Sequence, residues 1–362
     1  MKLQYSTENK ERSLKLVSAL QNWYDKSSRD LVWRKTQEPY SIWISEIMAQ
    51  QTRISAVLPY YERFMALFPH VEDLAVAPID VVLKAWEGLG YYSRAHNLSK
   101  TAKIIVEQYG GQFPKDVSLL KKLPGIGDYT AGAIASICFQ EPIPAVDGNV
   151  LRVFARLEDN EMDIKQTATK KCLTNYVADI LTNAKPGIFN QALMELGALI
   201  CLPKNPACEE CPVSVFCKAK QLDKQRILPY KSPKKEQTNA DKTILIIVNP
   251  KNEVLLRQRT ERLLHGLWEF YMPEVFLEED EIENALPYTL KKLSRIGEAS
   301  HAFTHIRWNM IGYKCDIEET EPLSGYEFVS IEEMQKRAMP VAISFYTKCL
   351  LEFYGIFPGK IQ

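Results

Sequence analysis

The chain has 362 residues, of which 46% are hydrophobic, so it is long enough for two folded domains and too apolar for a disordered protein. No apolar run approaches the roughly 20 residues that a membrane-spanning helix needs, and the first residues lack the apolar core of a signal peptide. We therefore expect a soluble, cytoplasmic protein. Its 45 basic and 45 acidic residues cancel, which excludes a uniformly basic protein.

The charge is unevenly distributed along the chain. Residues 236–362 contain 14 Lys and Arg against 20 Asp and Glu, a net charge of −6, so the preceding residues carry +6. Residues 218–235 alone hold seven Lys and Arg against one Asp. Such a stretch fits either the phosphates of a nucleic acid or an ordinary solvated linker, and charge alone does not decide between them.

Residues 8–220 are predicted to be helical, with apolar residues at helical spacing and Pro or Gly between the segments. Within the segment 42–68, Glu46 lies among apolar residues. A carboxyl group on an apolar helix face tends toward a raised pKa, which suits a general acid. The alternative is an ordinary surface glutamate, and the residues around Glu46 leave both open.

A turn that fits an anion follows at Leu123-Pro124-Gly125-Ile126-Gly127, between two predicted helices. A Gly-x-Gly turn that opens a helix exposes backbone N–H groups, and glycine lets a phosphate approach closely. About 20 residues further on lies Asp147, before Gly148 and Asn149. A carboxylate here either caps a helix or stabilises positive charge on a sugar, and the two roles are compatible.

Four of the eight cysteines are closely spaced. Cys201, Cys208, Cys211 and Cys217 form the pattern C-x6-C-x2-C-x5-C. Disulfides are uncommon in an intracellular protein, so four thiolates within 17 residues point to zinc or to an iron–sulfur cluster. Structural zinc sites usually have two close cysteine pairs. Here a single C-x2-C pair is flanked by wider gaps, a spacing that fits a [4Fe–4S] cluster better.

The pattern changes after residue 220. Residues 221–241 are polar and basic and are predicted to be a linker. Residues 242–362 are predicted to form an α+β domain, with strands in 242–259, 306–317 and 326–334 and a helix over 282–297.

The cysteine spacing, with Pro212 after the third cysteine, resembles that of the endonuclease III and MutY glycosylases, and residues 45–52 (SEIMAQQT) resemble the MutY signature. The resemblance implies an all-α helix-hairpin-helix glycosylase core with one [4Fe–4S] cluster. It implies a helical catalytic domain over residues 1–220, in which a six-helix barrel module spans about 31–147. Residues 1–30 and 148–220 would form the iron–sulfur module.

The same resemblance implies roles for four residues of a catalytic site. Glu46 would protonate the base as general acid, and Asp147 would stabilise the oxocarbenium-like transition state. Tyr129 stands where related lyases carry a Schiff-base lysine, so no amine nucleophile is expected. Tyr129 would support Asp147, and Asn149 would hydrogen-bond near the sugar.

Further residues are assigned to binding by resemblance. The segment Arg29-Asp30-Leu31-Val32-Trp33-Arg34 is similar to the family's RxLPWR element, with Val32 in place of proline. The residues expected to line an adenine pocket are Arg29, Leu31, Trp33 and Gln191. The residues expected to contact DNA are Gln51, Thr52, Tyr91, Leu123, Gly125 and Gly127, of which Gln51 and Tyr91 would fill or wedge the base stack.

Residues 242–362 resemble the MutT-like (Nudix-like) domain of MutY proteins. Phe303, Thr304 and His305 match a Phe-Ser-His motif that reads 8-oxoguanine, with Thr304 in place of serine. The Glu-rich catalytic box of a Nudix hydrolase does not follow Gly266-Leu267-Trp268, so no nucleotide hydrolysis is expected.

The resemblance as a whole implies a monomeric glycosylase that removes adenine from A·8-oxoguanine or A·G pairs in double-stranded DNA. Two alternatives are an endonuclease III-like glycosylase/lyase for oxidised pyrimidines, which Tyr129 disfavours, and a non-catalytic DNA-damage-binding protein, which the paired carboxylates disfavour.

Overall fold

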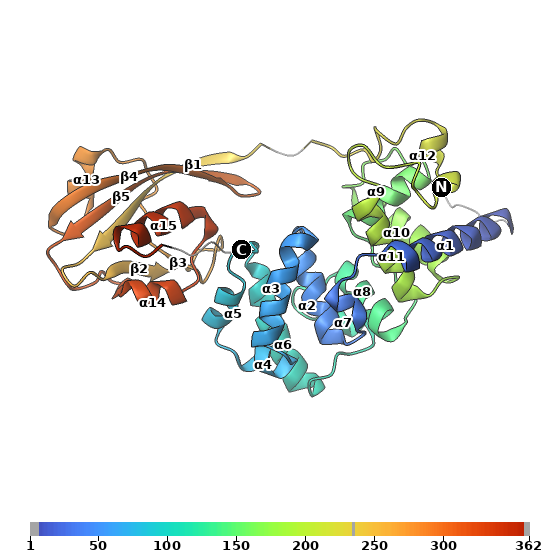
Figure 1. Cartoon of the computed structure of the whole chain (residues 1–362), viewed down its shortest axis with the longest axis horizontal. Helices are drawn as coiled ribbons and strands as arrows, with labels where there is room; N and C mark the ends of the chain where they lie inside the picture. The colour runs from blue at the N-terminus through green and yellow to red at the C-terminus, as the bar shows by residue number, and fades with distance from the viewer. Residues whose placement is uncertain (1–6, 234–235, 358–362) are drawn as a thin grey trace. The chain divides into compact units, whose positions relative to one another are not determined.

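The computed structural model describes residues 7–233 and 236–357, and the chain divides into two compact units. One unit comprises Met1–Ala75 and Lys100–Pro233, and the other comprises Val76–Ser99 and Lys234–Gln362. We call them the helical unit and the sheet unit (Figure 1). No helix in the described ranges is long and apolar enough to cross a membrane.

The helical unit is built from α-helices and two short 3₁₀ helices. Its elements are α1 (Thr7–Ser27), η1 (Val32–Lys35), α2 (Pro39–Ala49), α3 (Ile54–Leu67), α4 (Val71–Val76), α7 (Val117–Leu120), α8 (Asp128–Phe139), α9 (Gly148–Leu157), α10 (Thr167–Leu181), α11 (Pro186–Leu199), η2 (Ser214–Phe216) and α12 (Lys218–Gln221). Helix α6 (Ser93–Tyr109) begins in the sheet unit and continues in the helical unit. The helical content predicted for residues 8–220 is confirmed.

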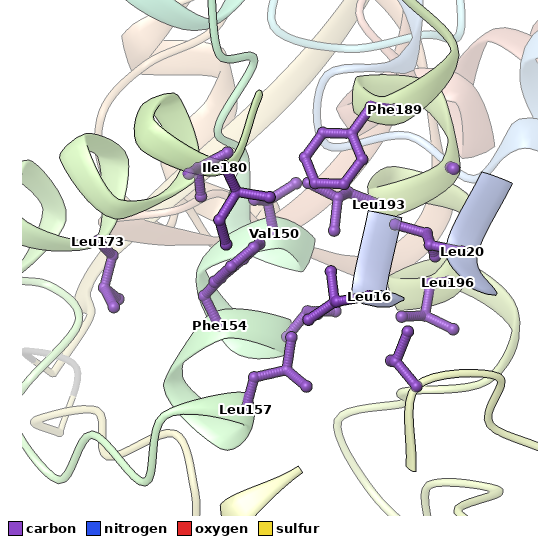
Figure 2. Close-up of a cluster of buried hydrophobic side chains, with 14 of the residues drawn as sticks. Leu16, Leu20, Val150, Phe154, Leu157, Leu173, Ile180, Phe189, Leu193 and Leu196 are labelled. Atoms are coloured by element: carbon purple, nitrogen blue, oxygen red, sulfur yellow. The ribbon is translucent and has the colours of Figure 1, made fainter. Parts of the chain in front are cut away.

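One core of the helical unit lies among α1, α9, α10 and α11 (Figure 2). Leu16 and Leu20 of α1 are one turn apart, as are Val150 and Phe154 of α9, so each pair presents one apolar face. Fully burying each such side chain contributes about 1.5–3 kcal/mol. This packing holds the beginning of α9, where Asp147 lies, against α11.

The sheet unit contains a six-stranded sheet together with short helices. Its other elements are α5 (Ile79–Ala85), β1 (Thr238–Val248), β2 (Val254–Gln258), β3 (Trp268–Glu269), α13 (Glu279–Ala285), β4 (Leu290–Ala302), β5 (Ile306–Ile317), β6 (Glu327–Val329), α14 (Ile331–Lys336), η3 (Val341–Ile343) and α15 (Ser344–Phe353). The strand order is β3-β2-β1-β5-β4, with β6 paired to β2. Strand β1 is parallel to β5, and the other pairs are antiparallel.

Both faces of this sheet are covered, which explains the continuous apolar run in β1. Ile244 and Ile246 face a core that α14 and α15 complete, whereas Leu245 and Ile247 face a core that includes Ile282 of α13. Gly312 of β5 is required by packing, because a Cβ there would lie 2.1 Å from the ring of Tyr346.

Two sequence expectations differ from the structure of these regions. The helix predicted over residues 282–297 ends at Ala285, and β4 occupies Leu290–Ala302. Of the linker predicted over 221–241, the part up to Pro233 is hydrogen-bonded to the helical unit, for example from Ile164 N to Tyr230 O, and β1 begins at Thr238. Lys234 and Lys235 of the basic stretch lie outside the described residues.

Candidate active site

A cavity of about 470 Å³ opens in the helical unit, and both predicted catalytic carboxylates face it. Its walls come from α2, the start of α3, α8, α9, α11 and the segments before and after α2. The residues predicted for the site that line the cavity are Arg29, Leu31, Trp33, Glu46, Thr52, Tyr129, Asp147, Asn149 and Gln191. The structure thus brings together in one pocket nine residues that are as much as 162 positions apart in the sequence.

Glu46 is presented by α2, a short helix with a well-defined start. Glu38 caps it by accepting hydrogen bonds from the backbone N–H groups of Tyr40 and Ser41, and Pro39 occupies the first turn. The pKa of Glu46 is raised to about 7, mainly by burial and also by the nearby charge of Asp147, although the Tyr129 hydrogen bond and the charge of Arg34 lower it. The raised pKa expected from the apolar helix face is therefore found.

Tyr129 lies in the first turn of α8, and its hydroxyl donates to Glu46 Oε2 at 2.5 Å. Met194 Sδ lies 3.0 Å from the same hydroxyl. Burial raises the pKa of Tyr129 well above its ordinary value, so the phenol keeps its proton. The hydrogen bond therefore joins Tyr129 to Glu46, whereas the resemblance had pointed to Asp147 as the group it supports.

Asp147 is the N-cap of α9. Its Oδ1 accepts hydrogen bonds from the backbone N–H groups of Asn149 and Val150, both at 2.8 Å, and its Oδ2 accepts one from Asn149 Nδ2 at 2.7 Å. Burial raises the pKa of Asp147, although these hydrogen bonds act in the opposite direction. The capping role and a position facing the cavity thus coexist, as the sequence suggested.

Asn149 is itself held closely in place. Its Oδ1 accepts a hydrogen bond from Arg152 Nη2 at 2.8 Å, and the same guanidinium donates to Gly197 O. A Cβ at Gly197 of α11 would lie only 2.5 Å from the Cβ of Asn149. Glycine at this position is what lets α11 approach the start of α9.

Sequence reasoning missed Glu195 and Arg34, which also line the cavity. Glu195 is 0% exposed and accepts hydrogen bonds from the backbone and guanidinium of Arg29 and from the guanidinium of Arg34. Burial alone would raise the pKa of Glu195, but these hydrogen bonds outweigh it and lower the pKa to about 2. The available signal was the position of Glu195 on the same face of α11 as Ala192 and Leu199, three residues before it and four after it.

The hairpin turn between α7 and α8 has the conformation that its glycines suggest. Leu123 and Ile126 are buried and anchor the turn, while Gly125 and Gly127 are exposed. Gly125 has φ +78°, which favours glycine, and a Cβ at Gly127 would meet open space. Gly127 is the N-cap of α8, so the first N–H groups of this helix are available to an anion.

The two residues predicted to enter the base stack both have unusual backbones. Gln51 (φ +60°) and Tyr91 (φ +47°) are exposed and adopt positive φ without being glycine. Such strain is concentrated at functional sites. Tyr91 belongs to the sheet unit, where its hydroxyl lies 3.4 Å from Thr304 Oγ1.

Phe303, Thr304 and His305 form the turn between β4 and β5. Phe303 packs edge-on against Trp308 with ring centroids 4.9 Å apart, and its backbone N–H donates to Ile306 O. Thr304 and His305 are exposed at the tip. The Thr304 hydroxyl is therefore accessible to a ligand.

Cys201, Cys208, Cys211 and Cys217 line a common small cavity of about 20 Å³ together with Arg156. Arg156 Nη1 donates a hydrogen bond to Cys201 Sγ at 3.2 Å. Within the described ranges no three His, Cys, Asp or Glu residues form a group that would hold a single metal ion. Four sulfurs around one cavity fit a four-iron cluster, whose ligands surround a cube and not a point.

The comparisons with known families agree with these sites. Residues 44–178 match the HhH-GPD superfamily of base excision DNA repair proteins, residues 201–217 match the iron–sulfur binding domain of endonuclease III, and residues 243–348 match the NUDIX domain. A thermostable thymine-DNA glycosylase superposes with a TM-score of 0.54 at 29% identity, covering 60% of this chain and 100% of that one. An endonuclease III–DNA complex shares the fold at 22% identity, with a TM-score of 0.51 over 59% of this chain and 98% of that one.

The helical unit and the four-cysteine segment thus define an iron–sulfur DNA glycosylase of the helix-hairpin-helix class. The adenine DNA glycosylase of Homo sapiens is 32% identical over 94% of this chain and 74% of its own length, and that of Rattus norvegicus is 35% identical over 90% and 75%. The chain belongs to the adenine DNA glycosylase family, the MutY type, and acts in base excision repair.

Proposed function

We propose that this chain removes adenine paired with 8-oxoguanine or guanine by hydrolysis, with Glu46 as general acid and Asp147 as the stabiliser of positive charge on the sugar. The observation that carries the proposal is the pair of carboxyl groups facing one cavity, of which Glu46 has a pKa raised to about 7. An acid with a pKa near the working pH is an effective proton donor.

The chemistry requires both groups. Adenine is a poor leaving group until one of its ring nitrogens is protonated, and Glu46 supplies that proton. The N-glycosidic bond then breaks with its electrons passing to the base, and the sugar develops oxocarbenium character that the Asp147 carboxylate stabilises. Water then forms a bond to the sugar carbon that carried the base, and the proton it releases restores Glu46. Asn149 holds the carboxylate, and the Tyr129 hydroxyl orients Glu46.

The absence of a lyase step is part of the proposal. Tyr129 occupies the position where a Schiff-base lysine would act, and its raised pKa keeps the hydroxyl neutral. Cleavage of the DNA strand is therefore expected only after alkali.

Binding is assigned to residues around the cavity and in the sheet unit. Arg29, Leu31, Trp33 and Gln191 line the cavity and are proposed to receive the flipped adenine. Gln51, Thr52 and Tyr91 are proposed to contact the opened stack, and the turn Leu123–Gly127 to bind phosphate. The exposed turn Phe303–His305 is proposed to read 8-oxoguanine. We also propose that the chain acts as a monomer.

The test is a base-release assay on duplexes with A·8-oxoguanine, A·G and thymine glycol, with and without alkali. Glu46→Gln is expected to bind the A·8-oxoguanine duplex normally and to excise adenine about 10²–10⁴-fold more slowly. Glu62→Gln, the same change at an exposed glutamate of α3, is the matched control. Full excision by Glu46→Gln, or a borohydride-trapped adduct of the unsubstituted protein, would contradict the proposal.

A further inference from the structure

The turn that carries Tyr91 is held in an unfavourable conformation. Gly88 has φ +101° and Gly90 has φ +69°, values that suit glycine. Tyr91 has φ +47°, where the Cβ of an L-residue is crowded. A strained residue of this kind keeps its conformation only if its surroundings impose it.

Arg94, in the first turn of α6, provides those surroundings. It is only 8% exposed, and its Nη2 donates to Leu89 O at 2.9 Å and to Gly90 O at 3.0 Å. Its backbone N–H donates to Tyr91 O at 2.9 Å. One residue therefore fixes the three carbonyl groups of Leu89, Gly90 and Tyr91.

The same guanidinium also lies close to two aromatic rings. Its Cζ is 5.1 Å from the ring centroid of Trp86 and 5.7 Å from that of Tyr91, within the range of a cation–π interaction. Trp86 is buried and donates from Nε1 to Gly90 O at 3.1 Å. Burial lowers the pKa of Arg94 to about 10, which still leaves it charged at neutral pH. Tyr91, which is 47% exposed, therefore projects from a turn that these contacts hold in place.

We propose that Arg94 is a positioning residue that holds the Gly88–Tyr91 turn so that the Tyr91 ring is preset to enter the DNA base stack. The inference rests on the proposed function, in which Tyr91 fills or wedges that stack. Arg94 then acts on the extrusion of adenine and not on the cleavage of the glycosidic bond. A lysine cannot replace it, because an ammonium group lacks the planar fork that contacts two carbonyls and two rings together.

The experiment measures base extrusion and bond cleavage separately. An A·8-oxoguanine duplex carries 2-aminopurine beside the target adenine, and its fluorescence rises when the stack opens. Single-turnover excision is measured on the same duplex with saturating protein. The variants are Arg94→Lys, Arg94→Met, Tyr91→Ala and the double variant Arg94→Met/Tyr91→Ala. Arg63→Met, which removes an exposed guanidinium from the ring of Tyr60, is the control.

Arg94→Lys and Arg94→Met are each expected to slow the fluorescence rise and excision about tenfold. Without the contacts of Arg94, Tyr91 spends less time in the strained conformation that enters the stack. Tyr91→Ala should slow both steps at least as much. The double variant should be no slower than Tyr91→Ala, because Arg94 acts through Tyr91. On a duplex whose stack is already opened by an abasic site beside the adenine, the Arg94 effect should fall below about twofold, since extrusion is then less costly.

The outcomes distinguish this inference from the proposed function. If Tyr91→Ala slows extrusion and Arg94→Lys does not, the positioning role is wrong and the wedge remains. If the Arg94 and Tyr91 effects multiply, or if Arg94→Lys is equally slow on the opened duplex, Arg94 does not act through the wedge and the inference is overturned. If Tyr91→Ala leaves extrusion unchanged, both the wedge and this inference fail. Thermal unfolding of each variant identifies any general loss of fold.

Discussion

Two glutamates face the same cavity from different helices, and their environments drive their pKa values in opposite directions. Glu46 of α2 is half-buried, next to a neutral phenol and near Asp147, and its pKa rises to about 7. Glu195 of α11 is buried with two guanidinium groups, and its pKa falls to about 2. Each shift from the ordinary value of 4.5 corresponds to a difference of about 3 kcal/mol in how the site favours the neutral or the charged form. The partner, and not burial itself, decides which glutamate can donate a proton.

The ion pair of Glu195 should therefore contribute to the stability of the fold. Its lowered pKa means that the contribution is present above pH 4.5 and is lost as the pH falls toward 2. Glu195→Gln leaves Arg29 and Arg34 without a counter-ion, and we expect a loss of about 3–5 kcal/mol at pH 7. Urea unfolding measures it, with Glu62→Gln as the control. A loss no larger than that of the control would show that the pair is not a structural anchor.

Glu46 should behave in the opposite way. Its folded pKa lies above the unfolded value, so below pH 4.5 both states hold the proton and Glu46 has no effect on stability. Between pH 4.5 and 7 the unfolded state loses its proton first, and above pH 7 the folded state carries the full cost of a buried charge.

We therefore expect Glu46→Gln to stabilise the protein by up to about 3 kcal/mol above pH 7 and to change nothing near pH 4. Urea unfolding across this pH range gives the measurement, and Glu62→Gln should show no such trend. A constant difference at all pH values would mean that the raised pKa of Glu46 is not the cause. If Glu46→Gln is more stable and less active, the ionisable group of Glu46 lowers the free energy of unfolding while serving excision.

The comparison of Glu46 and Glu195 also shows what could be predicted from sequence. Both residues lie among apolar neighbours at helical spacing, and only Glu46 was singled out, because a recognisable motif surrounds it. The charges that identify Glu195 as an anchor come from Arg29 and Arg34, more than 160 positions away. Local patterns predict that a carboxyl is buried, but its protonation depends on contacts that only the tertiary structure provides.

The helix wrongly extended over residues 282–297 has a different cause. Leu290, Leu293, Ile296 and Ala299 recur every three residues, as on a helix, yet they lie in β4. Register shifts at Leu290/Lys292 and Arg295/Gly297 each place an extra residue in the strand, so side chains three positions apart face the same side. Leu290 and Leu293 accordingly pack against one core, and Ile296 and Ala299 against the other. The two bulges therefore produce an apolar spacing of three residues in a strand, which resembles the spacing on a helix.

The smallest expected effect concerns the geometry of Asp147, the neighbour that raises the pKa of Glu46. Gly197→Ala places a methyl group 2.5 Å from the Cβ of Asn149, a part of the side chain that cannot swing away. We expect a loss of about 1–3 kcal/mol of stability from overpacking. Displacing Asn149 also shifts the carboxylate that it holds, and misplacement by about 1 Å can slow a reaction about 10²-fold.

Urea unfolding and single-turnover excision measure the two effects of Gly197→Ala, and Gly148→Ala is the stability control because its added methyl meets open space. The pH dependence of excision makes the test specific. If Asp147 moves away from Glu46, its contribution to the raised pKa shrinks, and the pH above which excision declines should fall below that of the unsubstituted protein. An unchanged pH profile together with slow excision would mean that Asn149 orients Asp147 toward the sugar without affecting Glu46, so that the two carboxyl groups act independently.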